Sequence, residues 1–283
     1  MSAKEQSENM EGWKQSAQYW DKYRPLIAQM FAPLTSLLVE EARIRSGQRV
    51  LDIGGGGGEP SLTISRIVGE KGSVMYTDPI AEMLETARNE ANELGLTNIS
   101  FTQCSGDDLP FADRTFDVAV GRLSAMFFAD PAAALRQALR VVVDGGRVSF
   151  VVWGSEAANP FFSAITDLVE ECVGPHADAS DAPDPFRFAV PGKLAEILKG
   201  AGATDVIERH LAFPVEAAIS FDQFWQLRTE MSQTLREKTA ALTAAQLAAV
   251  KRASADAARP YFVNGKMSFP AEAFAVTGRT AHS

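Results

Sequence analysis

Short apolar stretches rich in β-branched residues alternate along the chain with segments whose apolar and polar positions suit helices. The apolar stretches predict strands at residues 49–54, 73–78, 99–104, 116–121 and 146–153. Between them, residues 60–68, 80–94 and 131–143 are compatible with helices. Strands that alternate with helices favour a parallel sheet covered by helices on both faces.

The ends of the third helical segment carry signals of their own. Asp130 followed by Pro131 is typical of an N-cap and a first helical position. Gly145 and Gly146 predict a stop between this helix and the strand at 146–153.

The alternation weakens after residue 153. Residues 204–216 predict a sixth strand, and residues 267–278 predict a seventh that follows a turn at Asn264 and Gly265. The Ala-rich stretch 220–258 between them suits helices and is too long for a hairpin loop, so we expect an inserted helical lid.

The composition restricts the function. A chain of 283 residues with 46% hydrophobic residues can bury a full core, and a net charge of -9 argues against capture of nucleic acid. The N-terminus is polar without an apolar signal-peptide core, and no segment is long and apolar enough to cross a bilayer, so we expect a cytoplasmic protein. With 3 histidines and 2 cysteines, we expect no metal site.

The glycine run in RVLDIGGGGGEPSL, residues 49–62, predicts a loop that a ligand can approach closely. A phosphate-binding P-loop needs Lys and then Ser or Thr after its last glycine, but Glu59 and Pro60 stand there. The dinucleotide fingerprint G-x-G-x-x-G needs a third glycine at Glu59, Pro60 or Ser61, so every register fails. Glu59 also takes the place at the start of a helix where a phosphate would bind. The loop therefore suits a ligand without phosphates.

The pattern that remains is D-x-G-x-G-x-G, from Asp52 to Gly58, at the end of the first strand. Asp78 closes the second strand, where a carboxylate can accept hydrogen bonds from both hydroxyls of a ribose. A nucleoside with a charged amino-acid tail suits this arrangement. S-adenosylmethionine is such a ligand.

Three segments extend this pattern: VLDIGGGGGEPSL, TDPIAEMLETAR and DDLPFADRTFDVAVGRLSAMFFADPAAALRQALRVVVDGGRVSFVVW. With them the chain resembles the class I S-adenosylmethionine-dependent methyltransferases, in the group related to the ubiquinone and menaquinone biosynthesis C-methyltransferases. The similarity covers roughly residues 45–215 and the terminal strand. A glycine-rich turn alone is as often simple close packing, so the interpretation depends on the combination of these segments.

The resemblance implies an α/β, Rossmann-like fold: a seven-stranded, mostly parallel sheet with helices on both faces and a helical cap or lid. We divide the chain into an N-terminal helical cap segment, 1–45, and an S-adenosylmethionine-binding core, 46–215. An inserted helical lid, 216–265, and the terminal strand with a tail, 266–283, complete it.

The same resemblance implies the residues that would bind the methionine part and the ribose of the cofactor. Gly54 and Gly56 would lie under the methionine part, Asp52 would face its amino group directly or through water, and Asp78 would hold the ribose. Gly121, at the end of the fourth strand, is a further candidate for contact with the cofactor.

The adenine side departs from the family pattern. Pro79 and Ile80 would pack against adenine. Relatives usually have an acid and then a small residue before the LPF motif, whereas this chain has Ser105 and Gly106. The Gly106 N–H group would still bind adenine, and Ser105 or Asp107 would accept a hydrogen bond from its exocyclic amine.

A second motif, NPFF at residues 159–162, is similar to a signature of methyltransferases that act on amino groups of nucleic-acid bases. In those enzymes the signature follows the fourth strand, whereas here it follows the fifth. Asn159 as an N-cap, with Pro160 in the first turn, explains the motif. We therefore expect no nucleic-acid partner.

Methyl transfer needs an aligned acceptor, exclusion of water and, for a hydroxyl acceptor, removal of a proton. His176, in the loop GPHADASDAPDPFRF, is a candidate base. Tyr19 and Tyr23, on a helix that could close over the site, are further catalytic candidates, and packing against the sheet is the alternative for both. Residues 126–128 follow the fourth strand and would face the methyl group or belong to the core.

Aromatic residues gather at 160–162, 185–188, 221–225 and 261–263, in regions expected around the acceptor. They favour methylation of carbon or oxygen in a small lipophilic acceptor that is aromatic, quinone-like or polyketide-like, with S-adenosylhomocysteine as the second product. They could equally pack the lid on the core.

Two other functions stay open at this stage, a nicotinamide-dependent oxidoreductase and a non-catalytic methyltransferase-like protein that binds the cofactor. A homodimer is as compatible with the sequence as a monomer.

Overall fold

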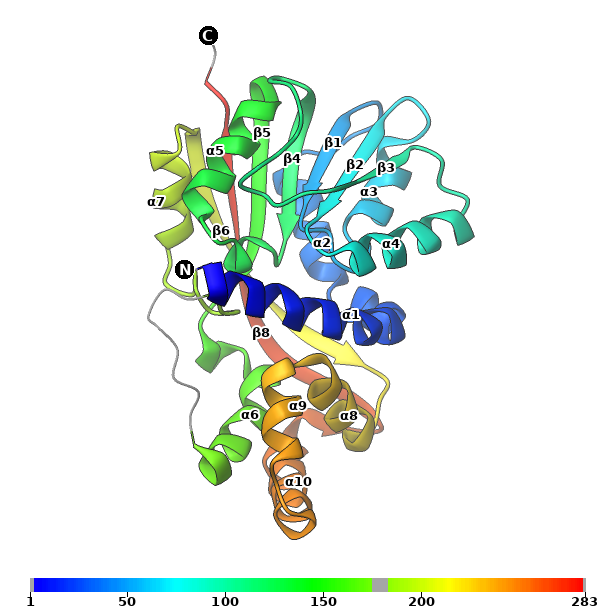
Figure 1. Cartoon of the computed structure of the whole chain (residues 1–283), viewed down its shortest axis with the longest axis vertical. Coiled ribbons are helices and arrows are strands. Elements are labelled where there is room, and N and C mark those ends of the chain that lie inside the picture. The colour runs from blue at the N-terminus through cyan, green and yellow to red at the C-terminus, as the bar shows by residue number, and fades with distance from the viewer. Residues whose placement is uncertain (1–2, 175–182, 282–283) are drawn as a thin grey trace.

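The computed structural model describes residues 3–174 and 183–281, and its centre is a mostly parallel sheet (Figure 1). The strands lie in the order β3 (Ile99–Gln103), β2 (Ser73–Asp78), β1 (Arg49–Ile53), β4 (Phe116–Arg122), β5 (Val142–Trp153), β8 (Lys266–Arg279) and β6 (Thr204–Ala217). The first five pair in parallel, whereas β8 is antiparallel to both of its neighbours. The predicted α/β fold with a seven-stranded sheet is confirmed, and a short β7 (Phe262–Val263) that the sequence did not predict pairs with β8.

The central parallel strands β1 and β4 carry apolar, buried side chains on both faces. Val50 and Leu51 on β1 and Val118 and Val120 on β4 are at most 1% exposed. Parallel neighbours need crossover connections, which here contain α3 (Ser61–Val68), α4 (Ala81–Glu93) and α5 (Pro131–Val141). The Asp130 side chain accepts a hydrogen bond from the Ala133 N–H at 2.9 Å, so the predicted N-cap of α5 is confirmed.

The strand β5 begins earlier than the sequence predicts. Val142 already pairs with β4, and the register shifts before Arg147. Gly145 and Gly146 lie within this irregular stretch, and an added Cβ at Gly146 would lie 2.7 Å from the Asp117 carbonyl oxygen. The expected stop before the strand is therefore wrong, because the two glycines let β5 bulge against its neighbour.

The hairpin of β6 and β8 continues beyond the end of the sheet. The pairing of β5 with β8 ends at Trp153 and Ala273, whereas that of β6 with β8 continues to Ala217 and Met267. The projecting half of the hairpin carries the helices α8 (Phe221–Met231), α9 (Gln233–Ala240) and α10 (Ala244–Ala258), which we call the lid helices. Capping boxes at Ser220 and Thr243 fix the starts of α8 and α10.

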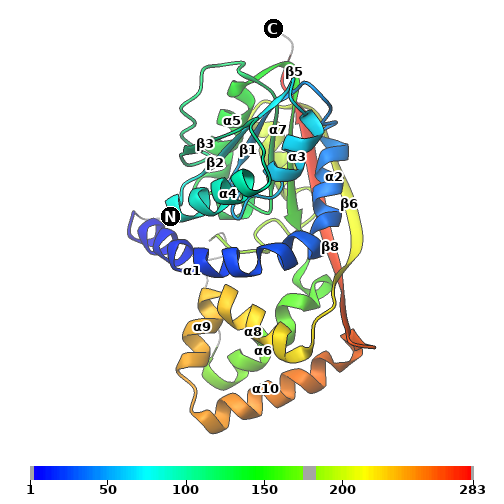
Figure 2. The same ribbon diagram turned by 90° about the vertical axis from the view of Figure 1, so that its right-hand side faces the viewer.

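One long helix separates the sheet from the lid. Figures 1 and 2 show α1 (Ala3–Met30) crossing the carboxyl edge of the parallel strands, with the lid helices and α6 (Pro160–Val173) on its other side. The remaining helices are α2 (Ala32–Glu41), α7 (Lys193–Gly200) and the short η1 (Ala125–Phe127), η2 (Glu156–Ala158) and η3 (Arg259–Tyr261). In the described part of the chain, no helix has the length and apolar character needed to cross a membrane.

Candidate functional site

Asp52 and Asp78 stand buried at the carboxyl ends of the neighbouring strands β1 and β2. Asp52 Oδ2 accepts a hydrogen bond from Ser61 Oγ at 2.7 Å, whereas Asp52 Oδ1 has no partner within the described residues. Burial raises the pKa of Asp52 to about 7, against the effect of the Ser61 hydrogen bond. A buried carboxylate oxygen without a donor is what a bound ammonium group would satisfy.

Asp78, at the end of the neighbouring strand β2, holds the glycine loop through a hydrogen bond. Its Oδ2 accepts a hydrogen bond from the Gly56 N–H at 3.0 Å, and its Oδ1 accepts one from the Ile80 N–H at 2.9 Å. Burial raises the pKa of Asp78 to about 6, although both backbone donors lower it. Gly56 has a φ of 53°, and an added Cβ would meet no atom within 4 Å, so the loop leaves open space at this point. A carboxylate has room for further donors, which ribose hydroxyls could supply.

The start of α3 already holds a carboxylate. Glu59 Oε1 accepts a hydrogen bond from Thr63 Oγ1 at 2.9 Å, and Glu59 Oε2 accepts one from the Thr63 N–H at 3.3 Å. Negative charge thus occupies the helix terminus where a dinucleotide fold would place a pyrophosphate. This geometry agrees with a ligand that carries no phosphate.

The loops after β2 and β3, which the sequence assigns to adenine, are tied together. Gln103 Nε2 donates to the Pro79 carbonyl oxygen at 2.9 Å. Ser105 Oγ donates to Asp107 Oδ1, so the two candidate acceptors for the adenine amine are paired with each other. Gly106 faces Ile53, since an added Cβ would lie 3.0 Å from Ile53 Cγ2.

Helix α1 covers this region from outside. Ile80, a candidate contact of adenine, is only 6% exposed and packs with Ala17, Trp13 and Trp20 of α1. The Trp20 carbonyl oxygen lies 3.9 Å from the position of an added Cβ at Gly57. The glycine loop and the predicted adenine side therefore lie under α1.

Ser124, just after β4, ties that strand to the glycine loop. Its Oγ donates to the Ile53 carbonyl oxygen at 2.7 Å. An added Cβ at Gly54 would lie 2.7 Å from Ser124 Cβ, and one at Gly121 would lie 2.6 Å from Ser124 Oγ. The two predicted glycines thus serve close packing of the strand ends, whatever they contact in a complex. Sequence reasoning missed Ser124, although GRLS at a strand end was the available signal.

We expect Gly121→Ala to lower the free energy of unfolding by about 1–3 kcal/mol, the usual effect of overpacking a core. The added Cβ would lie 2.5 Å from Phe150 Cε1 and would also press on Ser124. Urea unfolding measures the change. Gly200→Ala is the matched control, because an added Cβ there meets nothing within 4 Å. A Gly121→Ala protein as stable as the control would show that the strand ends can move apart.

Arg122, at the end of β4, adds a positive charge beside Asp52. Its Nη1 donates to Thr35 Oγ1 at 2.8 Å, and its Nε has no partner in the part of the chain that the structure describes. Burial lowers the pKa of Arg122, whereas the carboxylates of Glu59 and Asp52 raise it. A free amino acid carries one ammonium and one carboxylate group, and Asp52 and Arg122 offer an opposite charge to each.

The tyrosines predicted to act in catalysis contact the lid helices. Tyr23 Oη donates to Glu230 Oε2 at 2.7 Å, and burial raises the pKa of Tyr23, so its hydroxyl stays protonated near neutral pH. The Arg236 guanidinium lies 5.0 Å from the centre of the Tyr19 ring. Their catalytic role stays a prediction. His176 lies outside the described residues.

Phe128 is the member of segment 126–128 that lies against the loop. An added Cβ at Gly106 would lie 3.4 Å from the Phe128 ring, and one at Gly54 would lie 3.9 Å from it. Phe127 instead packs edge-on against Trp13 of α1 at a centroid distance of 4.9 Å. The core alternative holds for Met126, which is 1% exposed, and the expectation that Phe127 and Phe128 face the methyl group stays a prediction.

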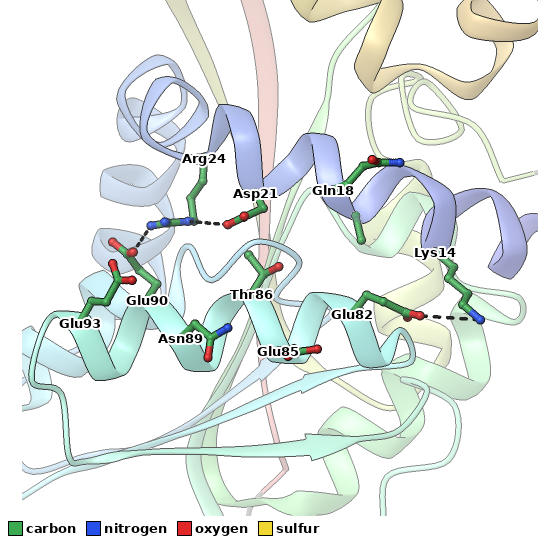
Figure 3. A pocket seen from close by; sticks show the side chains of 11 residues that line it. Lys14, Gln18, Asp21, Arg24, Glu82, Glu85, Thr86, Asn89, Glu90 and Glu93 are labelled. Carbon is green, nitrogen blue, oxygen red and sulfur yellow. Dashed lines mark ion pairs between the residues drawn. The ribbon is translucent and has the colours of Figure 1, made fainter.

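A polar groove of about 470 Å³ between α1 and α4 is separate from this site (Figure 3). Lys14 pairs with Glu82 across it, and Arg24 pairs with Glu90. None of the predicted cofactor residues lines the groove. Among residues 3–174 and 183–281, no three His, Cys, Asp or Glu side chains gather as a metal ion would require.

The NPFF motif lies at the start of α6, as predicted, but the Asn159 side chain bonds elsewhere. Asn159 makes no side-chain cap to α6. Its Nδ2 instead donates to the carbonyl oxygens of Ser155 and Glu272, and its Oδ1 accepts from the Glu272 N–H. The predicted position of Asn159 as N-cap residue, with Pro160 in the first turn, is confirmed, while its buried amide links the chain after β5 to β8 instead of capping the helix.

The aromatic residues of the lid region form one connected cluster. Phe161 on α6 contacts Phe224 on α8 at a centroid distance of 5.4 Å, and Phe224 contacts Phe269 at 5.1 Å. Phe224 and Phe269 are completely buried, so they pack the lid on the hairpin. Phe162 and Phe186 are only partly buried, and their rings lie 5.2 Å apart. They belong to the part of the cluster next to Trp153 at the end of β5.

The chain matches the model of the ubiE/COQ5 methyltransferase family over residues 18–177. It belongs to this family. The match includes both aspartates, the glycine loop and the end of β4, and it stops before the lid helices. Helices α8 to α10 are therefore outside the region that defines the family.

Relatives in this family share the cofactor half of the chain. The ubiquinone/menaquinone biosynthesis C-methyltransferase UbiE of Haemophilus ducreyi is 40% identical over 126 residues, covering 44% of this chain and 47% of that protein. The protein of the same name from Photorhabdus laumondii is 33% identical over 160 residues, with 56% and 57% covered. The chain thus spans about half the length of the curated relatives it matches.

Solved structures resemble the whole fold. The YcgJ protein from Bacillus subtilis has a TM-score of 0.57 at 21% identity and covers 88% of this chain and 98% of its own. The [4+2]-cyclase SpnF has a TM-score of 0.55 at 20% identity, with 96% and 97% covered. These identities establish the likeness of the fold alone, and the neighbours' different names illustrate that one fold serves several reactions.

Proposed function

We propose that this protein transfers a methyl group from S-adenosylmethionine to carbon or oxygen of a small lipophilic acceptor. The observation that carries the proposal is the unpartnered Oδ1 of the buried Asp52, beside Asp78 and an open glycine loop, in a member of the ubiE/COQ5 methyltransferase family. A ligand with an ammonium group supplies the partner that Asp52 Oδ1 lacks, and a ribose supplies further donors for Asp78.

Residues at the strand ends offer groups complementary to the amino-acid part and the ribose of the cofactor. Asp52 would bind the ammonium group and Arg122 the carboxylate of its methionine part, and Asp78 would accept the ribose hydroxyls. When bound, the cofactor's sulfonium supplies a methyl group already activated for displacement. The chain then has to orient the acceptor and exclude water, for which α1 and the lid helices lie at the carboxyl edge of the sheet (Figure 2). A phenol or an enol-like carbon needs no strong base, so the raised pKa of Tyr23 does not conflict with the proposal.

Two observations support the proposed chemistry of the methyl acceptor. The UbiE relatives are named for ubiquinone and menaquinone biosynthesis, which favours a quinone-like ring. The partly buried Phe162 and Phe186, next to the Trp153 indole at the end of β5, provide an apolar surface for such a ring.

The two alternative functions, an oxidoreductase and a non-catalytic cofactor-binding protein, predict different behaviour toward ligands. A nicotinamide-dependent oxidoreductase would need a pyrophosphate site where the Glu59 carboxylate caps α3. A non-catalytic relative would bind S-adenosylmethionine without transferring its methyl group.

Isothermal titration with S-adenosylmethionine, S-adenosylhomocysteine and NADH tests the proposal first. We expect micromolar binding of the two sulfur nucleosides and none of NADH, followed by methyl transfer to phenols or quinols in a product assay. Failure of both sulfur nucleosides to bind would reject the proposal, whereas binding without transfer to any acceptor would favour the non-catalytic alternative.

A further inference from the structure

One buried arginine of the lid has no carboxylate partner among the residues that the structure describes. Arg228 on α8 is 9% exposed, and its Nε has no hydrogen-bond partner within the described residues. Its Nη2 makes a single long hydrogen bond of 3.4 Å to the Phe162 carbonyl oxygen. Burial lowers the pKa of Arg228 to about 10, and no carboxylate of residues 3–174 or 183–281 opposes that effect.

The immediate neighbours of Arg228 are aromatic faces. Its guanidinium lies 5.1 Å from the centre of the Phe161 ring and 4.9 Å from that of Phe162. Aromatic faces attract a cation but accept no conventional hydrogen bond along its N–H directions. The guanidinium therefore keeps unused donors in an apolar setting, where an unpaired charge destabilises the fold.

A second lid arginine shows how the same helices satisfy this side chain when its role is structural. Arg236 on α9 donates to the Glu230 carbonyl oxygen and to Ser16 Oγ, the latter at 2.9 Å, and it stacks on the Tyr19 ring. Arg236 thus joins α9 to α1. Within the described part of the chain, Arg228 makes no such link to a charged or hydroxyl group.

Contacts of the Phe162 ring lead from Arg228 toward the glycine loop. The Phe162 ring under the guanidinium contacts Trp153 at the end of β5 and Phe186, with centroid distances of 5.3 Å and 5.2 Å. The residue after Phe186, Arg187, donates to the Phe128 carbonyl oxygen at 2.7 Å. Since the Phe128 ring lies against the glycine loop, a chain of neighbouring residues leads from Arg228 through Phe162, Phe186 and Arg187 to that loop.

We propose that Arg228 binds a carboxylate of the methyl acceptor, while the aromatic rings around it hold the acceptor's apolar body. A planar guanidinium presents paired N–H donors that match a carboxylate, and the unpaired charge of Arg228 is complementary to it. This inference rests on the proposed methyltransferase function and narrows its substrate class from a neutral lipophilic ring to an aromatic acid.

The test compares 2-naphthoate with 2-naphthamide, which share size and ring and differ in charge. Binding to the full chain is measured by calorimetry, with and without S-adenosylhomocysteine. We expect the acid to bind at least tenfold more tightly than the amide. In Arg228→Met this preference should disappear while amide binding is unchanged, and in Arg252→Met, which alters an exposed arginine of α10, it should persist.

Stability measurements separate a binding role from a structural one. If Arg228 serves a ligand, Arg228→Met should leave the apo protein as stable as the wild type or more stable, because it removes a buried unpaired charge. If Met at this position prevents folding, Arg228→Lys keeps the charge without the planar fork and should lower the preference for the acid several-fold.

Equal binding of acid and amide by the wild type, or an unchanged preference in both Arg228 variants, would overturn the inference. Lower stability of Arg228→Met together with equal binding would assign the residue to packing. The titration with S-adenosylhomocysteine alone reports separately on the proposed function, because it does not involve Arg228.

Discussion

Replacing Asp78 by alanine is expected to weaken the binding of S-adenosylmethionine by about a hundredfold or more. The variant would lose two hydrogen bonds between a charged acceptor and the ribose hydroxyls, each contributing roughly 1.5–3 kcal/mol. It would also remove the acceptor of the Gly56 and Ile80 N–H groups, so the glycine loop would lose its anchor. Calorimetric titration measures the affinity.

A matched variant and a folding check make this result specific. Asp256→Ala changes an exposed aspartate of α10 that pairs locally with Arg259, and we expect this variant to bind the cofactor with wild-type affinity. Circular dichroism and the unfolding temperature of Asp78→Ala show whether the fold persists. A folded Asp78→Ala protein with wild-type affinity would remove Asp78 from the ribose site.

The strands of the sheet could be predicted because each is determined by its own residues. Continuous apolar runs such as the one in β1 can only be buried on both faces, and their alternation with helices fixes the parallel arrangement. The start of β5 could not be predicted in the same way. Gly145 and Gly146 stop a helix in most settings, but here β4 lies alongside and pairs with Val142 ahead of them.

The cofactor side of the candidate site could also be located from the sequence, since the glycine loop, Asp52 and Asp78 belong to short segments with recognisable spacing. The sequence could not show that Asp78 holds the loop through Gly56 or that Ser124 packs against Gly54, because those partners lie on different strands. Spatial neighbours of this kind appear only once the register of the sheet is known.

The lid side of the site was the least predictable part. Tyr23 is a plausible catalytic residue by type, yet its partner Glu230 is 207 residues away in the sequence and engages its hydroxyl. Arg228 gives no signal at all in the sequence, since arginines in helices are usually exposed. Its burial depends on the projecting hairpin of β6 and β8, which brings α8 onto the two phenylalanines at the start of α6.

The affinity for S-adenosylhomocysteine is expected to rise tenfold or more between about pH 5.5 and 7.5, because an ammonium group needs the ionised form of Asp52. Burial raises the pKa of Asp52 from 3.8 to about 7, so this carboxyl is mostly protonated at the lower end of that range and mostly ionised at the upper end. Asp78, with a pKa of about 6, ionises earlier in the same range. Titrations at several pH values measure the change.

The variant Asp52→Asn tests whether ionisation of Asp52 causes this pH dependence of the affinity. It keeps the size of the side chain but cannot ionise, so the pH dependence of the affinity should be reduced to the part due to Asp78. The affinity at pH 7.5 should fall by about thirtyfold, which corresponds to the loss of one charged hydrogen bond of about 2 kcal/mol.

The stability of the unliganded wild type should show the opposite trend with pH. Its two buried carboxyls hold protons that the unfolded chain releases at lower pH, so their contribution to stability decreases as pH rises from about 4 to 7. An affinity that does not change with pH in the wild type, or that changes equally in Asp52→Asn, would mean that Asp52 does not bind the ammonium group.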